Sequence, residues 1–247
     1  MKKLLSLVIL LSLCLSLNAQ MIEQRRDSSR VSSFNPKELI LPASLMAAGS
    51  LGFIPEVKDL VIDVRDDVLE WRGDRTTEID TYLQFLPHLS YYGLSLVGLD
   101  AKHNYVDRTL VIATSTVATL AITHGAKCLF GVERPDGSDN RSFPSGHSAR
   151  VFMGAELVRM EYGEEYPLIG VGAYTLATAV AALRVYNNKH WVTDVVAGAG
   201  VGILSARIGY WLLPYTREMM YRITGHEAFV YPMVGGNTVA LGVSMSF

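Results

Sequence analysis

Cysteine is scarce in this chain, with two in 247 residues. Cys14 lies in an apolar N-terminal segment, and once that segment is removed Cys128 has no partner for an internal disulfide. We expect Cys128 to be a buried structural thiol. Histidine and cysteine also show no clustering at metal-ligand spacing, so the sequence predicts no metal centre.

A charge excess of either sign is missing as well. The formal net charge is -2, and no basic stripe alternates with aromatic residues, which excludes a nucleic-acid-binding role. A dinucleotide fingerprint is also lacking. Gly198, Gly200 and Gly202 lie inside an apolar helical pattern with no strand before it, and this predicts close helix packing rather than a phosphate loop.

The N-terminal segment, residues 1–19, is typical of a secretory signal peptide. Two lysines precede an apolar run from Leu4 to Leu17, and Asn18 and Ala19 follow it. An uncleaved anchor is the alternative, although the apolar run is short for a membrane span. Residues 20–36 are mostly polar and predict a flexible leader.

The region 37–225 contains the apolar stretches from which a core can form. Six stretches are each long enough for a helix, so the sequence predicts an all-α fold, a six-helix bundle in one domain. A charged segment from Lys58 to Asp80 interrupts them; it indicates a solvated helix, with a lid beside the site as the alternative. The stretches are 39–55, 81–99, 109–126, 151–160, 167–183 and 195–213.

The C-terminal residues 226–247 have a different pattern. A turn signal at 235–237 is followed by alternation of small or polar residues with apolar ones up to Phe247. This period of two predicts a short C-terminal β-hairpin. Since one hairpin cannot close a barrel, we expect it to dock on the bundle or on a neighbouring chain.

The segment from Arg184 to Asp194 concentrates polar chemistry between two apolar stretches. His190 and Asp194 are four residues apart, so in a helix the carboxylate can accept an imidazole proton. This contact fixes one tautomer and leaves the other nitrogen bare, which makes His190 a candidate nucleophile. Arg184 presents a fork of donors that matches phosphate oxygens. The alternative is an Arg184–Asp194 ion pair on a solvated face, with His190 capping a turn.

Two upstream segments supply matching chemistry. Residues 144–147 read Pro-Ser-Gly-His, a turn followed by the opening of a helix, where backbone amides converge on a nearby anion. Lys127 and Arg134 are cations seven residues apart beside a bend at Pro135. On the helix scheme above, all three segments meet at one end of the bundle.

These three blocks resemble the signatures of the type 2 phosphatidic acid phosphatase superfamily, which also includes bacterial nonspecific acid phosphatases and vanadium haloperoxidases. Order, spacing and residue type agree in all three blocks, and the resemblance covers residues 127–194 directly. One departure is Leu183, where the family usually has a serine, and it affects a minor contact near Arg184.

The resemblance implies a phosphatase site that needs no metal and no cofactor. His190, oriented by Asp194, would attack phosphorus to give a phosphohistidine. His147 would protonate the leaving oxygen and then activate the water that hydrolyses the intermediate. The groups that would hold the phosphoryl oxygens are Lys127, Arg134, Ser145, the amide of Gly146, and Arg184.

The function expected from this resemblance is hydrolysis of phosphate monoesters or terminal phosphates of envelope lipids, such as a phosphatidate, a polyprenyl diphosphate or a glycolipid phosphate. A lipid is favoured because the site would open beside apolar helices. The alternatives are a soluble, broad-specificity periplasmic acid phosphatase, a vanadate-dependent peroxidase and a non-catalytic envelope scaffold. The head group and the oligomeric state stay open.

Membrane association is expected, and its form is left open. Four of the six stretches contain 17 to 19 residues free of Lys, Arg, Asp and Glu, close to the length that crosses a bilayer. Against a span, Arg150, Glu156, Arg159 and Arg207 are costly in lipid unless they are buried in protein. With a cleaved signal, three full crossings would also place Lys127 on the cytoplasmic side. We therefore expect an exported enzyme of a bacterial-type envelope with its site facing the periplasm, either integral or peripheral.

Overall fold

The structure is a computed structural model that describes residues 34–224, 227–235 and 238–246. The predicted signal peptide, and the leader up to residue 33, lie outside these residues. Helices account for most of the described chain, which confirms the all-α class. In chain order the elements are η1 (Pro36–Leu39), α2 (Ile40–Ser50), η2 (Leu51–Phe53), α3 (Pro55–Arg72), α4 (Ile79–Leu83), α5 (Leu86–Leu96), α6 (Tyr105–Phe130), α7 (Gly146–Tyr162), α8 (Pro167–Tyr186), α9 (Val192–Thr224), β1 (Glu227–Gly235) and β2 (Thr238–Ser246).

Local sequence signals set the ends of several helices. The Asn104 side chain caps α6 by accepting hydrogen bonds from two backbone amides of its first turn, and Gly131 ends that helix with a left-handed φ of 55°. Ser145 caps α7, while Pro55 and Pro167 begin α3 and α8, where a proline loses no helical hydrogen bond.

The six expected helices correspond to α2, α5, α6, α7, α8 and α9. The structure adds α3 and the short α4 between the first two, and α3 is the helix expected from the charged segment. Its Val61, Val64 and Val68 are buried, so α3 is amphipathic rather than solvated all round. α9 continues past the expected end at residue 213, through Pro214, to Thr224.

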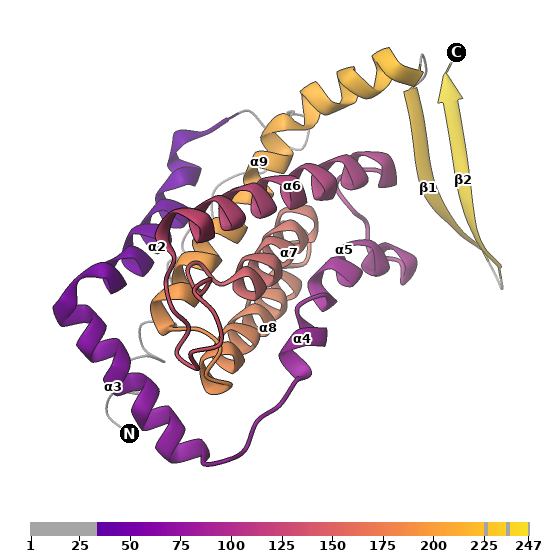
Figure 1. Cartoon of the computed structure of the whole chain (residues 1–247). Coiled ribbons are helices and arrows are strands. Elements are labelled where there is room, and N and C mark those ends of the chain that lie inside the picture. Colours follow the sequence, from indigo (N-terminus) through magenta and orange to yellow (C-terminus); the bar gives the residue numbers. More distant parts are fainter. Residues whose placement is uncertain (1–33, 225–226, 236–237, 247) are drawn as a thin grey trace.

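Helix α7 is the centre of the bundle. It packs against α9, α8, α5 and α6, and Val151, Ala155 and Leu157 on different sides of it are completely buried. Figure 1 shows α7 and α8 between α2 and α3 on one side and α4 and α5 on the other. Residues on nearly every side of α7 are buried, including the charged Glu156 and Glu161, because helices pack on all of its faces.

Gly198, Gly200 and Gly202 of α9 serve close packing, as predicted. A Cβ built at Gly198 or Gly202 would meet α7 backbone oxygens, at 2.5 Å from Ser145 O and 2.2 Å from Ala149 O. A Cβ at Gly200 would instead lie 2.7 Å from Pro42 O of α2. Glycine therefore lets α9 approach two different helices on two of its faces.

Three of the charges counted against a membrane span are paired with one another. Glu156 is fully buried and accepts from Arg159 at 2.6 Å, from Tyr174 at 2.6 Å and from Arg207 at 3.0 Å. Arg150 donates to Gln84. These contacts answer the objection that such charges are too costly for a membrane-spanning bundle, since the carboxylate and both guanidinium groups on it face protein.

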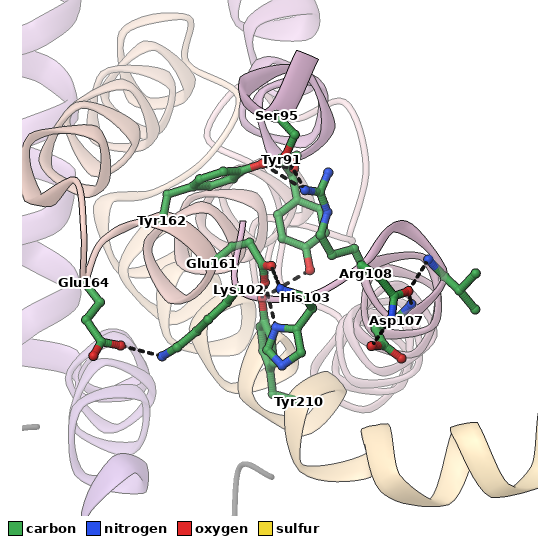
Figure 2. Close-up of polar contacts among 12 residues, drawn as sticks. Tyr91, Ser95, Lys102, His103, Asp107, Arg108, Glu161, Tyr162, Glu164 and Tyr210 are labelled. Carbon is green, nitrogen blue, oxygen red and sulfur yellow. Dashed lines mark hydrogen bonds and ion pairs between the residues drawn. The ribbon is translucent and has the colours of Figure 1, made fainter. Parts of the chain in front are cut away.

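A second polar cluster lies at the other end of α6 and α7 (Figure 2). Arg108 is fully buried; it donates to Ser95 at 2.7 Å and to Tyr162 at 3.0 Å. Glu161 accepts from Tyr210 at 2.7 Å, and its other oxygen accepts from the backbone amide of His103. This cluster joins α5, α6, α7 and α9 far from the residues of the predicted site.

Three described helices are long and apolar enough to cross a membrane, namely α6, α8 and α9. The segments Pro36–Phe53 and Pro55–Arg72 meet at 91° and would add a fourth if counted as one broken span.

Cys128 is exposed, and the prediction of a buried thiol is therefore wrong. It lies on the outer side of the last turns of α6, where Leu129 and Phe130 are exposed too.

The C-terminal hairpin is present. β1 pairs with β2 in antiparallel register, with Glu227 opposite Ser246 and Gly235 opposite Thr238. β1 lies near α6 and α5, and Figure 1 shows the hairpin beyond the end of α9.

Candidate active site

The residues singled out in the sequence meet at one end of the bundle. This end is formed by the last turn of α6, the loop 131–145, the first turn of α7, the last turn of α8 and the loop 187–191. Arg184 lies within α8 rather than after it, and His190 lies in the turn just before α9. The residues that lie at this end are Lys127, Arg134, Ser145, Gly146, His147, Arg184, His190 and Asp194.

His190 and Asp194 are both buried and face each other. The His190 Nδ1 atom lies 3.5 Å from Asp194 Oδ2. The same carboxylate oxygen accepts the backbone N–H of Trp191 at 2.9 Å, in the first turn of α9. A carboxylate at this position satisfies an amide that the helix itself leaves unpaired, so Asp194 is fixed by α9 and in turn positions His190.

The contact with Arg134 indicates which ring nitrogen of His190 is unprotonated. Its Nη1 lies 3.4 Å from His190 Nε2 and 3.2 Å from Lys189 O. A guanidinium group can only donate hydrogen bonds, so Nε2 presents its lone pair and the ring proton is on Nδ1, toward Asp194. Arg134 is itself held by Asp139 at 2.7 Å.

Lys127 lies beside the loop that follows it. Its ammonium group donates to the carbonyl oxygen of Arg141 and lies 3.4 Å from that of Ser142. The cation at the end of α6 is thereby held beside the residue that precedes the Phe143–Pro144 bond. It is half-buried, which leaves part of its donor capacity accessible from the site.

Arg184 is buried and anchored by residues that sequence reasoning missed. Asp80 of α4 is fully buried and accepts from Arg184 Nη1 at 2.6 Å and from Asn187 Nδ2 at 2.9 Å. The Asn187 amide also bonds both ways with the backbone of Thr77. In the sequence Asp80 is the end of a charged segment, and nothing local to it indicates a contact with Arg184, 104 positions away.

The start of α7 is fixed against the start of α9. The amide of Ser145 donates to Asp194 O at 3.0 Å, and Ser148 Oγ donates to Val195 O at 2.8 Å. Ser145 Oγ caps the helix by accepting the Ser148 amide. The free amides of this first turn point out of the helix end beside His147, where a helix attracts anions.

Both histidines of the site are neutral at pH 7. Burial lowers the pKa of His190 to about 4, with Arg134 and Arg184 acting in the same direction and Asp194 acting against them. Burial also lowers the pKa of His147 to about 3, assisted by Arg184 and Arg150. A dense group of cations around two imidazoles disfavours a further positive charge.

Helix α3 lies beside the site. The guanidinium group of Arg65 lies 5.6 Å from the ring centroid of Trp191, which follows His190. Near the C-terminal end of α3, Trp71 meets Tyr186 edge to face at 5.8 Å. The charged segment therefore forms a helix with side chains against Trp191 and Tyr186, and the alternative of a lid stays a prediction.

Ser142 is a further residue that sequence reasoning missed. Its hydroxyl contacts both His190 and Asp194, although it precedes them by 48 and 52 positions. Its place two residues before Pro144 in the second block was the available signal.

Within residues 34–224, 227–235 and 238–246, no three His, Cys, Asp or Glu residues are arranged to hold a metal ion.

Residues 108–218 match the sequence model of the PAP2 superfamily. That range contains all eight site residues named above and Ser142, whereas Asp80 lies outside it.

Over 193 residues the chain is 32% identical to a lipid A 1-phosphatase of Porphyromonas gingivalis, covering 76% of this chain and 42% of that protein. The chain thus spans less than half the length of this relative. Two solved structures are also similar. One is Aquifex aeolicus LpxE, with a TM-score of 0.43 and 20% identity over 58% of this chain and 92% of that one. The other is a transmembrane PAP2 type phosphatidylglycerolphosphate phosphatase of Bacillus subtilis, with a TM-score of 0.40 and 19% identity over 73% and 98%.

Proposed function

We propose that this chain, which matches the PAP2 superfamily over residues 108–218, hydrolyses phosphate monoesters or terminal phosphates of envelope lipids through a phosphohistidine on His190. One observation carries the proposal. His190 Nε2 is unprotonated and lies 3.4 Å from Arg134 Nη1, while the Nδ1 proton faces Asp194, and this is the tautomer in which an imidazole can attack phosphorus.

The first step transfers the phosphoryl group to the enzyme. His190 Nε2 forms a bond to phosphorus while the bond from phosphorus to the leaving oxygen breaks, and His147 gives that oxygen its proton. Since the free enzyme holds His147 neutral, the required proton is acquired with the substrate: a bound phosphate anion raises the pKa of His147 by opposing the cations around it.

The second step releases phosphate. Water attacks the phosphorus of the phosphohistidine, His147 takes a proton from that water, and the bond from Nε2 to phosphorus breaks. The phosphoryl oxygens carry the negative charge in both steps. Lys127, Arg134 and Arg184, with Ser145 and the amide of Gly146, would stabilise it, and no cofactor is part of this proposal.

A lipid is the proposed substrate class, with a phosphatidate, a polyprenyl diphosphate and a glycolipid phosphate as candidates. Two observations support it. Helix α6, which carries Lys127 at its last turn, is one of the three helices with the length and composition of a membrane span. The relative from Porphyromonas gingivalis is named for a phosphatase activity on lipid A.

The proposal includes a location and a division of the chain. Membrane association is supported by α6, α8 and α9. We place the protein in a bacterial-type envelope with the site facing the periplasm after export by residues 1–19. Residues 20–36 would be a leader, 37–225 the catalytic bundle and 226–247 a C-terminal hairpin.

The test is phosphate release by the purified full chain in detergent with a chelator present. The substrates are a phosphatidate, an undecaprenyl diphosphate, lipid A and p-nitrophenyl phosphate. We expect His190→Ala to lower turnover of the lipids by at least about 10⁴-fold, because the nucleophile is lost. His124→Ala is the matched control, since this exposed histidine of α6 bonds, among the described residues, to the Leu120 carbonyl of its own helix.

The outcomes separate the candidate functions. Acid-labile phosphate trapped on the wild type but not on His190→Ala would support the mechanism and rule out a non-catalytic scaffold. Equal rates on p-nitrophenyl phosphate and on lipids would favour a broad-specificity acid phosphatase. Full activity in His190→Ala would overturn the proposal.

A further inference from the structure

We propose that Ser142 is a positioning residue that bridges Asp194 to His190 by accepting the Nδ1–H of the ring. This inference rests on the proposed function and adds a member to its site. Asp194 would then act on His190 through Ser142, which lies in the loop 131–145.

Distances place the hydroxyl between the two groups. Ser142 is completely buried, and its Oγ lies 2.5 Å from Asp194 Oδ2 and 3.4 Å from His190 Nδ1. The direct separation of Nδ1 from Oδ2 is 3.5 Å, and both contacts of Nδ1 are longer than the usual range of about 2.7–3.2 Å for a hydrogen bond between nitrogen and oxygen, so the ring proton lies between the two oxygens. The hydroxyl is therefore at least as close to the imidazole as the carboxylate is.

Donor and acceptor rules leave one arrangement. An ionised carboxylate only accepts, so the single proton of Ser142 Oγ goes to Asp194. Oγ then has only lone pairs to offer, and it can contact His190 solely by accepting the proton of Nδ1. Arg134, which only donates, requires the same tautomer from the opposite side of the ring.

The backbone around Ser142 fixes the position of this hydroxyl. The amide of Ser142 donates to Val132 O at 2.9 Å, which closes the loop after α6. The carbonyl oxygen of Ser142 lies 3.4 Å from the ammonium group of Lys127. One residue thus connects the cation on α6, the loop and the carboxylate on α9.

During phosphoryl transfer the role of this bridge grows. As Nε2 bonds to phosphorus, the ring gains positive charge and Nδ1–H becomes a stronger donor. Oγ is polarised by its own hydrogen bond to Asp194, so it can accept a stronger hydrogen bond from Nδ1–H without taking the proton. Loss of the hydroxyl should therefore slow the chemical step more than it weakens binding.

The experiment compares Ser142→Ala, Ser142→Thr and Ser205→Ala in the full chain. Ser205 of α9 is the matched control, because it is equally buried and its hydroxyl has no hydrogen-bond partner in the described part of the chain. We expect Ser142→Ala to lower kcat by about 10- to 100-fold with KM within about twofold, as for loss of one charge-assisted hydrogen bond. Ser142→Thr, which keeps the hydroxyl, should recover most of the rate, while Ser205→Ala keeps kcat.

A second readout does not depend on activity. Nitrogen-15 and proton NMR of the imidazole, with His190→Gln used to assign the signal, should show the Nδ1–H tautomer in both proteins, because Arg134 still requires it. The Nδ1 proton should resonate at higher field in Ser142→Ala, where one acceptor is lost. An unchanged Nδ1 proton shift and unchanged kcat in Ser142→Ala would overturn the inference while leaving the nucleophile in place. An inactive wild type with the expected change in that shift would instead reject the proposed function and retain the bridge.

Discussion

At the scale of single residues, neighbours set the chemistry of the site more than residue identity does. His190 and His147 are the same side chain, yet one has a carboxylate and a hydroxyl on Nδ1 while the other faces Arg184 and Arg150. The cations proposed to bind phosphate also disfavour protonation of both rings. In the proposed mechanism a bound phosphate anion would oppose these cations and raise the pKa of His147.

The lowered pKa of His190 predicts the acid limb of the pH profile. Only the neutral ring is a nucleophile, so kcat/KM should fall as the pH decreases through about 4 rather than through its usual value near 6.5. Asp194 raises this pKa, so Asp194→Asn should move the limb to lower pH and reduce the plateau by about 10²- to 10⁴-fold.

The measurement is kcat/KM on one phosphatidate between pH 3 and pH 8. Substrate ionisation is common to the wild type and Asp194→Asn, so the difference between their profiles reports on the enzyme. Samples returned to neutral pH after each exposure control for unfolding. A limb that moves upward in Asp194→Asn would contradict the sign of the carboxylate's effect.

At the scale of elements, the contact between α7 and α9 assembles the site. Ser145 at the start of α7 bonds to the Asp194 carbonyl at the start of α9, and Gly198 and Gly202 allow the two backbones to approach. Glycine in a helix is ordinarily unfavourable by about 1 kcal/mol relative to alanine. Here the close approach outweighs that cost.

We predict that Gly202→Ala destabilises the protein. Its Cβ would lie 2.2 Å from the Ala149 carbonyl oxygen, so one helix must shift, at a cost of about 1–3 kcal/mol. Gly172→Ala on α8 is the control, because a Cβ there meets nothing within 4 Å and should stabilise by about 0.4–1 kcal/mol. Thermal unfolding in detergent measures the change in stability of both variants. A lower Tm for Gly172→Ala than for Gly202→Ala would contradict the packing argument.

At the scale of the whole molecule, polar clusters lie inside an apolar bundle. Glu156 with its two arginines occupies the interior, and the cluster of Arg108 and Glu161 ties the end opposite to His190 (Figure 2). The outside of the long helices is apolar by comparison, with Val117, Leu129 and Leu168 exposed. This distribution suits a bundle whose surroundings are lipid.

We therefore predict that the full chain behaves as an integral protein. Membranes washed with 1 M salt and with carbonate at high pH should retain it, because α6, α8 and α9 would have to leave the hydrocarbon together. Release should require detergent, as followed by immunoblot of the pellet and supernatant. Release by carbonate alone would establish peripheral attachment instead.

The sequence by itself determined the features that depend on near neighbours along the chain. The three blocks, the pairing of His190 with Asp194 and the period of two in the C-terminal hairpin all rest on spacings of a few residues, where helix and strand geometry decide which side chains meet. The all-α class followed from apolar stretches of helical length for the same reason.

Only the tertiary structure decided the long-range partners. Asp80 holds Arg184 from 104 positions away, Ser142 reaches His190 across 48, and Arg207 pairs with Glu156 across 51. The side of α6 that carries Cys128 was likewise set by which helices pack on it, and it faces outward. Such contacts depend on the packing of distant helices, and helical periodicity within one segment carries no information about the segment that will lie against it.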